Sequence, residues 1–137
     1  KTELEWFLLD NPSHKHVQDF VRELLHIYKK NPAMYELDHS WDGFEWINAN
    51  DGDRSIFSFV RKSPTKRNNI LLVVNFTPVD RPDYRVGVPK KKQYKLIMNE
   101  NGMCEQKVFK AEKSECDNRP FSFAYPLPAY GVGIFLY

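Results

Sequence analysis

The sequence predicts a mainly β protein, an antiparallel β-sandwich preceded by one amphipathic helix. From residue 40 onward, short runs alternate apolar and polar residues with a period of two, the signature of half-buried strands. These runs recur about every 8–12 residues and are separated by Gly, Pro, Asn and Asp, which is typical of sandwiches. Only residues 14–30 repeat apolar side chains at three- and four-residue steps, so this segment alone is expected to be helical.

The helix, HKHVQDFVRELLHIYKK, has recognisable ends. Oxygens of Asp10 and Ser13 are expected to cap its start, with Pro12 in the first turn, and Asn31-Pro32 ends it. Its apolar stripe consists of Val17, Phe20, Val21, Leu24, Leu25 and Tyr28. Because a lone helix cannot bury a stripe, we expect it to pack on the sheet or to mediate self-association with a second copy.

The strands are expected, in order, at residues 44–50, 55–62, 69–77, 83–88, 93–99, 106–112, 120–127 and 131–137. The run from Ile70 to Val74 lacks alternation, which predicts a central strand buried on both faces. One shared core is expected to contain Ile56, Phe57, Phe59, Val60, Ile134 and Leu136.

Composition narrows the possible partners. The 20 basic and 18 acidic residues give a net charge of +2, which does not indicate nucleic-acid binding. No apolar run approaches about 20 residues and no leader is recognisable, so neither a membrane partner nor export is expected.

Cys104 and Cys116 are interpreted as reduced thiols of a cytoplasmic protein. Because the chain begins at Lys1 rather than Met, we expect it to be a piece of a longer protein.

The titratable residues do not form a recognisable catalytic or metal site. His14 and His16 are two residues apart near the helix start, so they point in different directions and do not form an i, i+4 metal pair. The carboxylate pairs at residues 36 and 38 and at 51 and 53 lie in polar turns, where they are expected to be solvated. We therefore assign no catalytic, metal-binding or cofactor-binding residue and expect no cofactor.

The stretch GFEWINAND, residues 43–51, contains Trp46, whose role can be interpreted in two ways. Phe44, Trp46 and Asn48 should share one strand face because side chains alternate. Trp46 is interpreted either as an interdomain packing residue or as a platform for a sugar ring, with Asn48 and Asp51 accepting hydroxyl hydrogen bonds. Trp41 lies in a polar loop and is a candidate exposed contact.

Several blocks of residues, in order, resemble the C-terminal region of bacterial-type glycogen (1,4-α-glucan) branching enzymes of the α-amylase superfamily. The resemblance covers essentially the whole chain and is carried by LEWFLLD at 4–10, QDFVREL at 18–24, ELD at 36–38, GFEWI at 43–47, NFTPV at 75–79 and YRVGVP at 84–89. The segment after Asn99, ENGMC, departs from it, because the family usually carries a Ser/Thr-Asp and a Gly-rich loop there.

The resemblance implies a division at residue 37. Residues 1–37 would be the end of a (β/α)8 catalytic barrel with its last helix, and residues 38–137 an α-amylase-type C-terminal sandwich. The parent enzyme would cleave an α-1,4-glucan and transfer the segment to a 6-hydroxyl, using carboxylates upstream of this chain, so the chain alone should be inactive. Its partners would be α-glucan and the upstream barrel in cis, with Trp46, Trp41 and Asn48 as candidate glucan-binding or interdomain residues.

Two alternatives remain open. The first is a stand-alone α-glucan-binding module, which predicts an exposed row of aromatic residues and measurable affinity for maltooligosaccharides. The second is a purely structural β domain of another α-amylase-superfamily enzyme, which predicts a fully buried Trp46.

Overall fold

The computed structural model describes residues 3–65, 67–103 and 107–137, and it confirms one long helix followed by antiparallel strands. A short 3-10 helix, η1 (Trp6–Asp10), precedes α1 (Pro12–Lys30), and two more, η2 (Pro32–Met34) and η3 (Trp41–Gly43), lead to the first strand. The strands are β1 (Phe44–Asp51), β2 (Ile56–Arg61), β3 (Ile70–Asn75), β4 (Arg81–Val88), β5 (Gln93–Asn99), β6 (Gly102–Met103), β7 (Val108–Lys110), β8 (Phe121–Leu127) and β9 (Val132–Leu136).

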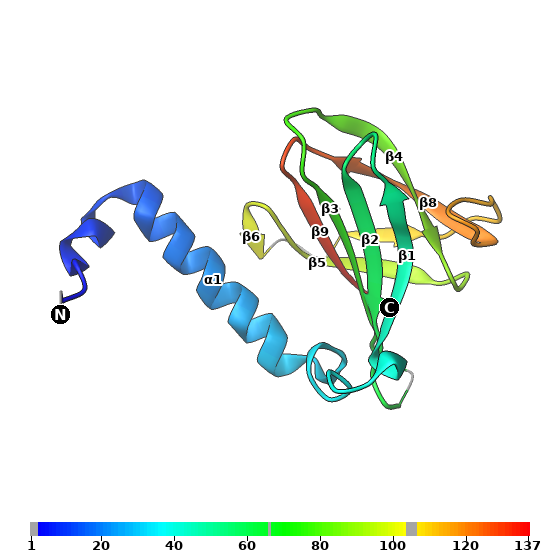
Figure 1. The fold of residues 1–137 in the computed structure, drawn as a ribbon, viewed down its shortest axis with the longest axis horizontal. Helices are drawn as coiled ribbons and strands as arrows, with labels where there is room; N and C mark the ends of the chain where they lie inside the picture. The colour runs from blue at the N-terminus through cyan, green and yellow to red at the C-terminus, as the bar shows by residue number, and fades with distance from the viewer. Residues whose placement is uncertain (1–2, 66, 104–106) are drawn as a thin grey trace.

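The strands form two sheets of unequal size (Figure 1). The large sheet has the order β1-β2-β3-β9-β5-β6, with β7 also paired to β5, and the small sheet consists of β4 and β8. Each of the pairings between these strands is antiparallel. β3 lies between β2 and β9, which confirms the prediction of a central strand at Ile70–Val74.

The main core lies between the two sheets. Fully buried Val60, Leu71 and Phe135 of the large sheet pack with Val86 of β4 and Phe123 of β8. Phe123 also contacts Phe135 ring to ring, with centroids 5.3 Å apart. Interdigitated aliphatic and aromatic side chains therefore hold the small sheet on the inner face of the large one.

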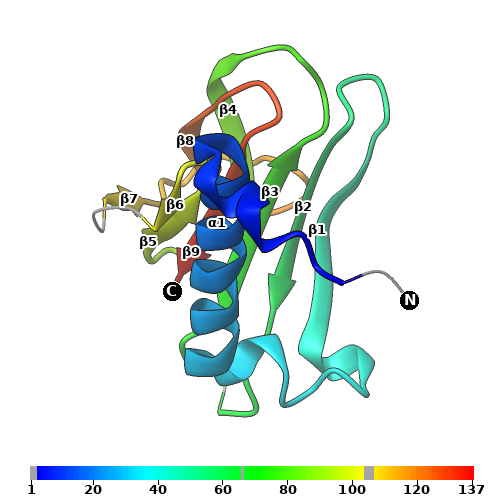
Figure 2. The same cartoon turned by 90° about the vertical axis from the view of Figure 1, so that its left-hand side faces the viewer.

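The opposite, outer face of the large sheet carries a second cluster. Ile70, Met98 and Ile134 from β3, β5 and β9 pack there with Ile27 of α1 and its half-buried neighbour Leu24. Figure 2 shows α1 lying across this face. The expectation that the helix packs on the sheet is thus confirmed for one part of its stripe.

The expectation of a single core for six named residues is wrong. Strand alternation sends Ile56 and Val60 to the inner cluster, whereas Ile134 belongs to the helix-covered outer cluster and Leu136 packs against it. Both faces of the large sheet are apolar, so alternation alone could not assign each residue to a face.

The helix also begins differently from the prediction. Asn11 is the capping residue, and its side-chain oxygen accepts hydrogen bonds from the backbone N–H of Ser13 at 3.0 Å and from the Ser13 hydroxyl at 2.8 Å. Asp10 instead ends η1. Pro12 occupies the first helical turn as expected, because its missing N–H would have no partner there.

Candidate functional site

Aromatic side chains gather on the outer face of β1 and β2 and at the ends of the neighbouring loops. This surface, called here the aromatic face, consists of Trp41, Phe44, Trp46, Phe57, Phe59 and Phe76. Ring centroids of Phe44 and Trp46 are 5.0 Å apart, and those of Phe57 and Phe76 are 5.7 Å apart. The rings therefore form one connected row rather than isolated side chains.

The aromatic face lies on the same side of the large sheet as α1. Trp46 pairs across the strands with Phe59, and Phe59 pairs with Leu72. Residues opposite each other on antiparallel strands share a face, and Leu72 packs in the helix-covered cluster. α1 therefore covers β3, β9 and β5, while β1 and β2 carry exposed aromatic residues beside it.

Three of these six aromatic residues are exposed, and the other three are half-buried. The exposed fractions are 46% for Trp46, 62% for Phe76 and 85% for Trp41. A contiguous exposed apolar surface of this kind marks an interaction site more often than a free surface. The structure thus brings Trp41 and Trp46 into one row, as two of the three candidate residues.

The third candidate, Asn48, does not share their face. The β1–β2 register shifts between Trp46 and Asn48, so Asn48 lies opposite the buried inner residue Ser58. The Asn48 amide donates to Asp117 Oδ1 at 2.8 Å, and its oxygen accepts from the backbone N–H of Asn50 at 3.1 Å. The prediction that Asn48 lies beside Trp46 is wrong because the irregularity in β1 breaks the alternation.

The apolar stripe of α1 is too wide for one partner. At about 100° per residue, its apolar side chains span an arc of about 160°. Phe20, Leu24 and Ile27 occupy the part of the arc that faces the sheet. The other part, formed by Val17, Val21, Leu25 and Tyr28, is exposed, with Val17 at 61%.

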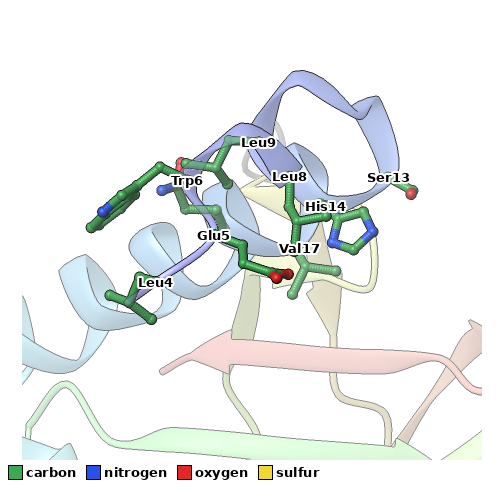
Figure 3. Close-up of a pocket in the computed structure, with 9 residues that line it drawn as sticks. Leu4, Glu5, Trp6, Leu8, Leu9, Ser13, His14 and Val17 are labelled. Carbon is green, nitrogen blue, oxygen red and sulfur yellow. The ribbon is translucent and has the colours of Figure 1, made fainter. Parts of the chain in front are cut away.

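An apolar hollow lies between η1 and the start of α1 (Figure 3). Its volume is about 500 Å³. In Figure 3, Leu4 and Trp6 stand on one side and Leu8, His14 and Val17 on the other. Here His14 lies beside apolar side chains, and the hollow extends the exposed part of the stripe toward residue 4.

One carboxylate of each turn is engaged in an ion pair. Asp51 lies 2.7 Å from Arg54 and is 3.4 Å from the Tyr84 hydroxyl, which donates to it. The Asp51 side chain is only 7% exposed, so the expectation that it is solvated is wrong. Asp38 pairs with Arg61.

Cysteine and histidine do not form a metal site in the part of the chain that the structure describes: no group of three or more His, Cys, Asp or Glu is placed to hold an ion. Cys116 is a free thiol, and burial raises its pKa to about 11, so it stays protonated near neutral pH. Cys104 lies outside the described residues. None of the described helices combines the length and apolar content needed to cross a bilayer.

A pocket lined by both polar and apolar side chains at one end of the sandwich has no counterpart in the sequence motifs. This end pocket has a volume of about 700 Å³, and its lining includes Trp41, Asp42, Glu45, Lys62, Asn69 and Tyr137. Glu45 is ion-paired with Lys62 at 2.6 Å and with Arg119 at 2.8 Å. Apart from the loop residues near Trp41, the lining comes from segments far apart in the chain, so no local pattern could have revealed it.

Comparison with known proteins identifies the domain. A family model described as "Alpha amylase, C-terminal all-beta domain" matches residues 46–137. The chain is 42% identical to a 1,4-alpha-glucan branching enzyme of Butyrivibrio fibrisolvens, over 100% of this chain and 22% of that protein. It is 40% identical to the enzyme of the same name from Aquifex aeolicus, over 96% of this chain and 22% of the relative.

A third relative, the 1,4-alpha-glucan branching enzyme of Halothermothrix orenii, is 36% identical over 93% of this chain and 21% of its own length. The chain thus spans about a fifth of the length of the curated relatives that it matches. These matches confirm the resemblance that the ordered blocks indicated. The chain therefore belongs to the alpha amylase, C-terminal all-beta domain family.

Proposed function

We propose that this chain is the C-terminal part of a 1,4-α-glucan branching enzyme and that it covers and stabilises the catalytic barrel. Residues 1–37 would complete the barrel with its last helix, and residues 38–137 would form the accessory sandwich. The observation that carries the proposal is the position of the aromatic face and the exposed stripe of α1 on one side of the large sheet. A single partner docked against that side would cover both surfaces.

The chemistry of such an enzyme belongs to the barrel. Cleavage of an α-1,4 linkage with retention and transfer to a 6-hydroxyl needs a nucleophile and an acid/base about 5 Å apart. The carboxylates of Asp38 and Asp51 are instead paired with Arg61 and Arg54. We therefore expect the chain alone to leave amylose unchanged, and the free thiol of Cys116 agrees with a reducing, cytoplasmic location.

Trp46 is proposed to be an interdomain contact. Its ring packs against Phe44 at 5.0 Å and Phe59 at 5.6 Å, which fixes the indole in the sheet surface, while 46% of the residue remains exposed. A rigid, half-covered aromatic residue of this kind is typical of the buried centre of an interface.

The proposal is tested with the full-length polypeptide that carries this chain. It should lower the iodine stain of amylose and create α-1,6 linkages detectable by NMR, whereas residues 1–137 alone should do neither. In the full-length protein, Trp46→Ala should lower the Tm of the catalytic domain. The matched variant Tyr130→Asn removes an aromatic residue that is 67% exposed in a turn outside the aromatic face, and its Tm should not change.

Two results would overturn the proposal: a full-length protein without branching activity, or a Trp46→Ala variant whose catalytic domain melts as the wild type does. The glucan-binding module is the second candidate, and the exposed aromatic row favours it. It requires residues 1–137 to bind maltoheptaose through the aromatic face and Trp46→Ala to abolish that binding without lowering stability.

A further inference from the structure

The segment before β8 makes a tight turn at residues 116–119, called here the seam turn. β1 is an edge strand of the large sheet, and β4 belongs to the small sheet. Side chains of the seam turn accept from or donate to residues of both strands. The turn therefore joins the two sheets along one side of the sandwich.

The seam turn is a two-residue hairpin turn. Cys116 and Arg119 exchange two backbone hydrogen bonds, of 3.0 and 2.8 Å. The two residues between them both have positive φ, +53° for Asp117 and +56° for Asn118. Positive φ at both central positions defines the type I′ turn, which Asp and Asn adopt more readily than most residues. The Arg119 side chain therefore extends from a well-defined backbone.

The small sheet holds one side of the seam turn. Asp117 Oδ2 accepts from the backbone N–H of Gly87 at 2.9 Å. The Cys116 thiol donates to the Arg85 carbonyl at 3.4 Å. Gly87 permits this approach, because a Cβ added there would clash with the Cys116 carbonyl. The turn is thus anchored on β4.

The large sheet contacts the seam turn at the position of Trp46. The Arg119 guanidinium donates to Glu45 Oε1 at 2.8 Å and to the Trp46 carbonyl at 3.1 Å. Further along β1, the Asn48 amide donates to Asp117 Oδ1 at 2.8 Å. The turn therefore holds β1 at residues that precede and follow the Trp46 side chain in the sequence.

The same stretch of β1 contains the irregularity that separates Trp46 from Asn48. Across the strands, the partners of Trp46 and Asn48 are consecutive residues of β2. Ile47 is therefore an extra residue on β1, which makes a β-bulge. A bulge bends the strand and changes the direction of the side chains beside it. Because the seam turn bonds to the Trp46 carbonyl before the bulge and to Asn48 after it, the turn holds the bulge in one geometry.

The bonds of Arg119 lie in a half-buried position. The side chains of Arg119 and Glu45 are each 27% exposed, and Glu45 is also paired with Lys62 at 2.6 Å. A charge-assisted hydrogen bond in such a place is stronger than an ion pair on the open surface. The planar guanidinium also fixes the directions of its N–H groups, which a lysine ammonium group does not. Arginine thus suits the task of fixing a backbone carbonyl in place.

We propose that Arg119 is a positioning residue for Trp46. By holding the Trp46 carbonyl and Glu45 against the seam turn, it fixes β1 so that the indole stands in the aromatic face. The role of this position in docking on the barrel rests on the proposed function. The coupling between Arg119 and the orientation of Trp46 rests only on the contacts described above. The small sheet would thereby control how the aromatic face meets its partner.

The test uses the full-length polypeptide labelled with 5-fluorotryptophan, in which the ¹⁹F resonances of Trp46 and Trp6 are identified by their absence in Trp46→Phe and Trp6→Phe. Arg119→Ala should shift or broaden the Trp46 resonance and leave that of Trp6, in η1, unchanged. Arg119→Lys should cause a smaller shift. The matched control is Arg85→Ala, because the Arg85 side chain donates to Ser122 of β8 at 2.9 Å instead of to β1. It should leave the Trp46 resonance in place.

Thermal unfolding of the same variants tests the consequence for docking. Arg119→Ala should lower the Tm of the catalytic domain, as Trp46→Ala does. The double variant should lower this Tm little further than Trp46→Ala alone, since an indole that is absent cannot be misplaced. Additive losses would contradict the positioning role. A Tm that falls in Trp46→Ala and stays unchanged in Arg119→Ala would contradict it as well.

The outcomes separate this inference from the proposed function. A Trp46 resonance that is the same in wild type, Arg119→Ala and Arg119→Lys would overturn the inference, whatever the Tm values are. A shifted resonance, with a catalytic-domain Tm that neither Arg119→Ala nor Trp46→Ala changes, would support the positioning of Trp46 and overturn its interdomain role. If Arg119→Ala does not fold, Arg119→Lys decides: a shifted Trp46 resonance supports the inference and an unshifted one overturns it.

Discussion

Glu23 of α1 accepts a hydrogen bond of 2.6 Å from the backbone N–H of Met103 in β6. The two residues are 80 positions apart, and the bond ties the helix to the edge hairpin of the large sheet. We expect Glu23→Ala to lower the free energy of unfolding by about 1 kcal/mol, since a hydrogen bond to a charged group is lost in a partly solvated position. Amide hydrogen exchange in α1 should accelerate, whereas Glu36→Ala, in an exposed turn, should leave exchange in α1 unchanged.

Gly102, next to Met103, allows this approach. Its φ is +103°, and a Cβ added there would clash with Glu23 Oε2. Gly102→Ala should therefore cost about 1–3 kcal/mol, through backbone strain and displacement of the carboxylate. Chemical denaturation measures the loss, and the double variant with Glu23→Ala should lose less than the sum of the two single variants. Full additivity would show that Gly102 and Glu23 act independently.

The helix and most strands could be predicted because their periodicity is local. The stripe at residues 14–30 and the unbroken apolar run from Ile70 to Val74 each predict one element, and both are present as α1 and β3. The predicted strand at 106–112 is only partly recovered as β7, and β6 was not predicted because it is too short for any pattern. β6 matters because the backbone N–H of Met103 donates to Glu23 of α1, a contact that no spacing in the sequence shows.

The candidate site was predictable only in part, for reasons visible in β1. Alternation correctly placed Phe44 and Trp46 on one face, but the register shift that follows moved Asn48 to the other. Bulges of this kind depend on the pairing of two strands and leave no mark in one strand's sequence. The same limit applies to the end pocket, where Glu45, Lys62 and Tyr137 meet only through the fold.

Asp117 holds the segment before β8 against both sheets. It accepts from the Asn48 side chain at 2.8 Å and from the backbone N–H of Gly87 at 2.9 Å, and its φ of +53° is uncommon for a residue other than glycine. Asp117→Ala should cost about 2 kcal/mol, because two donors lose their acceptor and alanine tolerates this backbone poorly. Asp117→Asn should cost less, since asparagine tolerates positive φ and retains one acceptor. Equal losses in the two variants, measured by denaturation, would contradict this account.

Cys116 provides a prediction about pH. Burial, then the charge of Asp117, raises the pKa of this thiol from 9.0 to about 11. As the pH rises, the thiol ionises at a lower pH in the unfolded chain than in the folded protein. The contribution of the protonated thiol to the free energy of unfolding is therefore complete below pH 9 and is lost as the pH rises to about 11. In a Cys104→Ser background, alkylation of the folded protein by iodoacetamide should remain slow at pH 9 and rise toward pH 11. A thiol that reacts at pH 9 as fast as in the denatured protein would contradict the burial.

The exposed part of the α1 stripe predicts self-association when residues 1–137 are produced alone. Val17, Val21 and Leu25 would remain in water without a partner, and burying them between two copies is favourable. Sedimentation velocity should show a concentration-dependent rise in mass, and Val21→Glu or Leu25→Glu should return the chain to a monomer. His26→Glu places the same charge on the opposite side of the helix and should not change the association. A wild-type chain that stays monomeric at every concentration would show that the exposed part of the stripe does not drive self-association of residues 1–137.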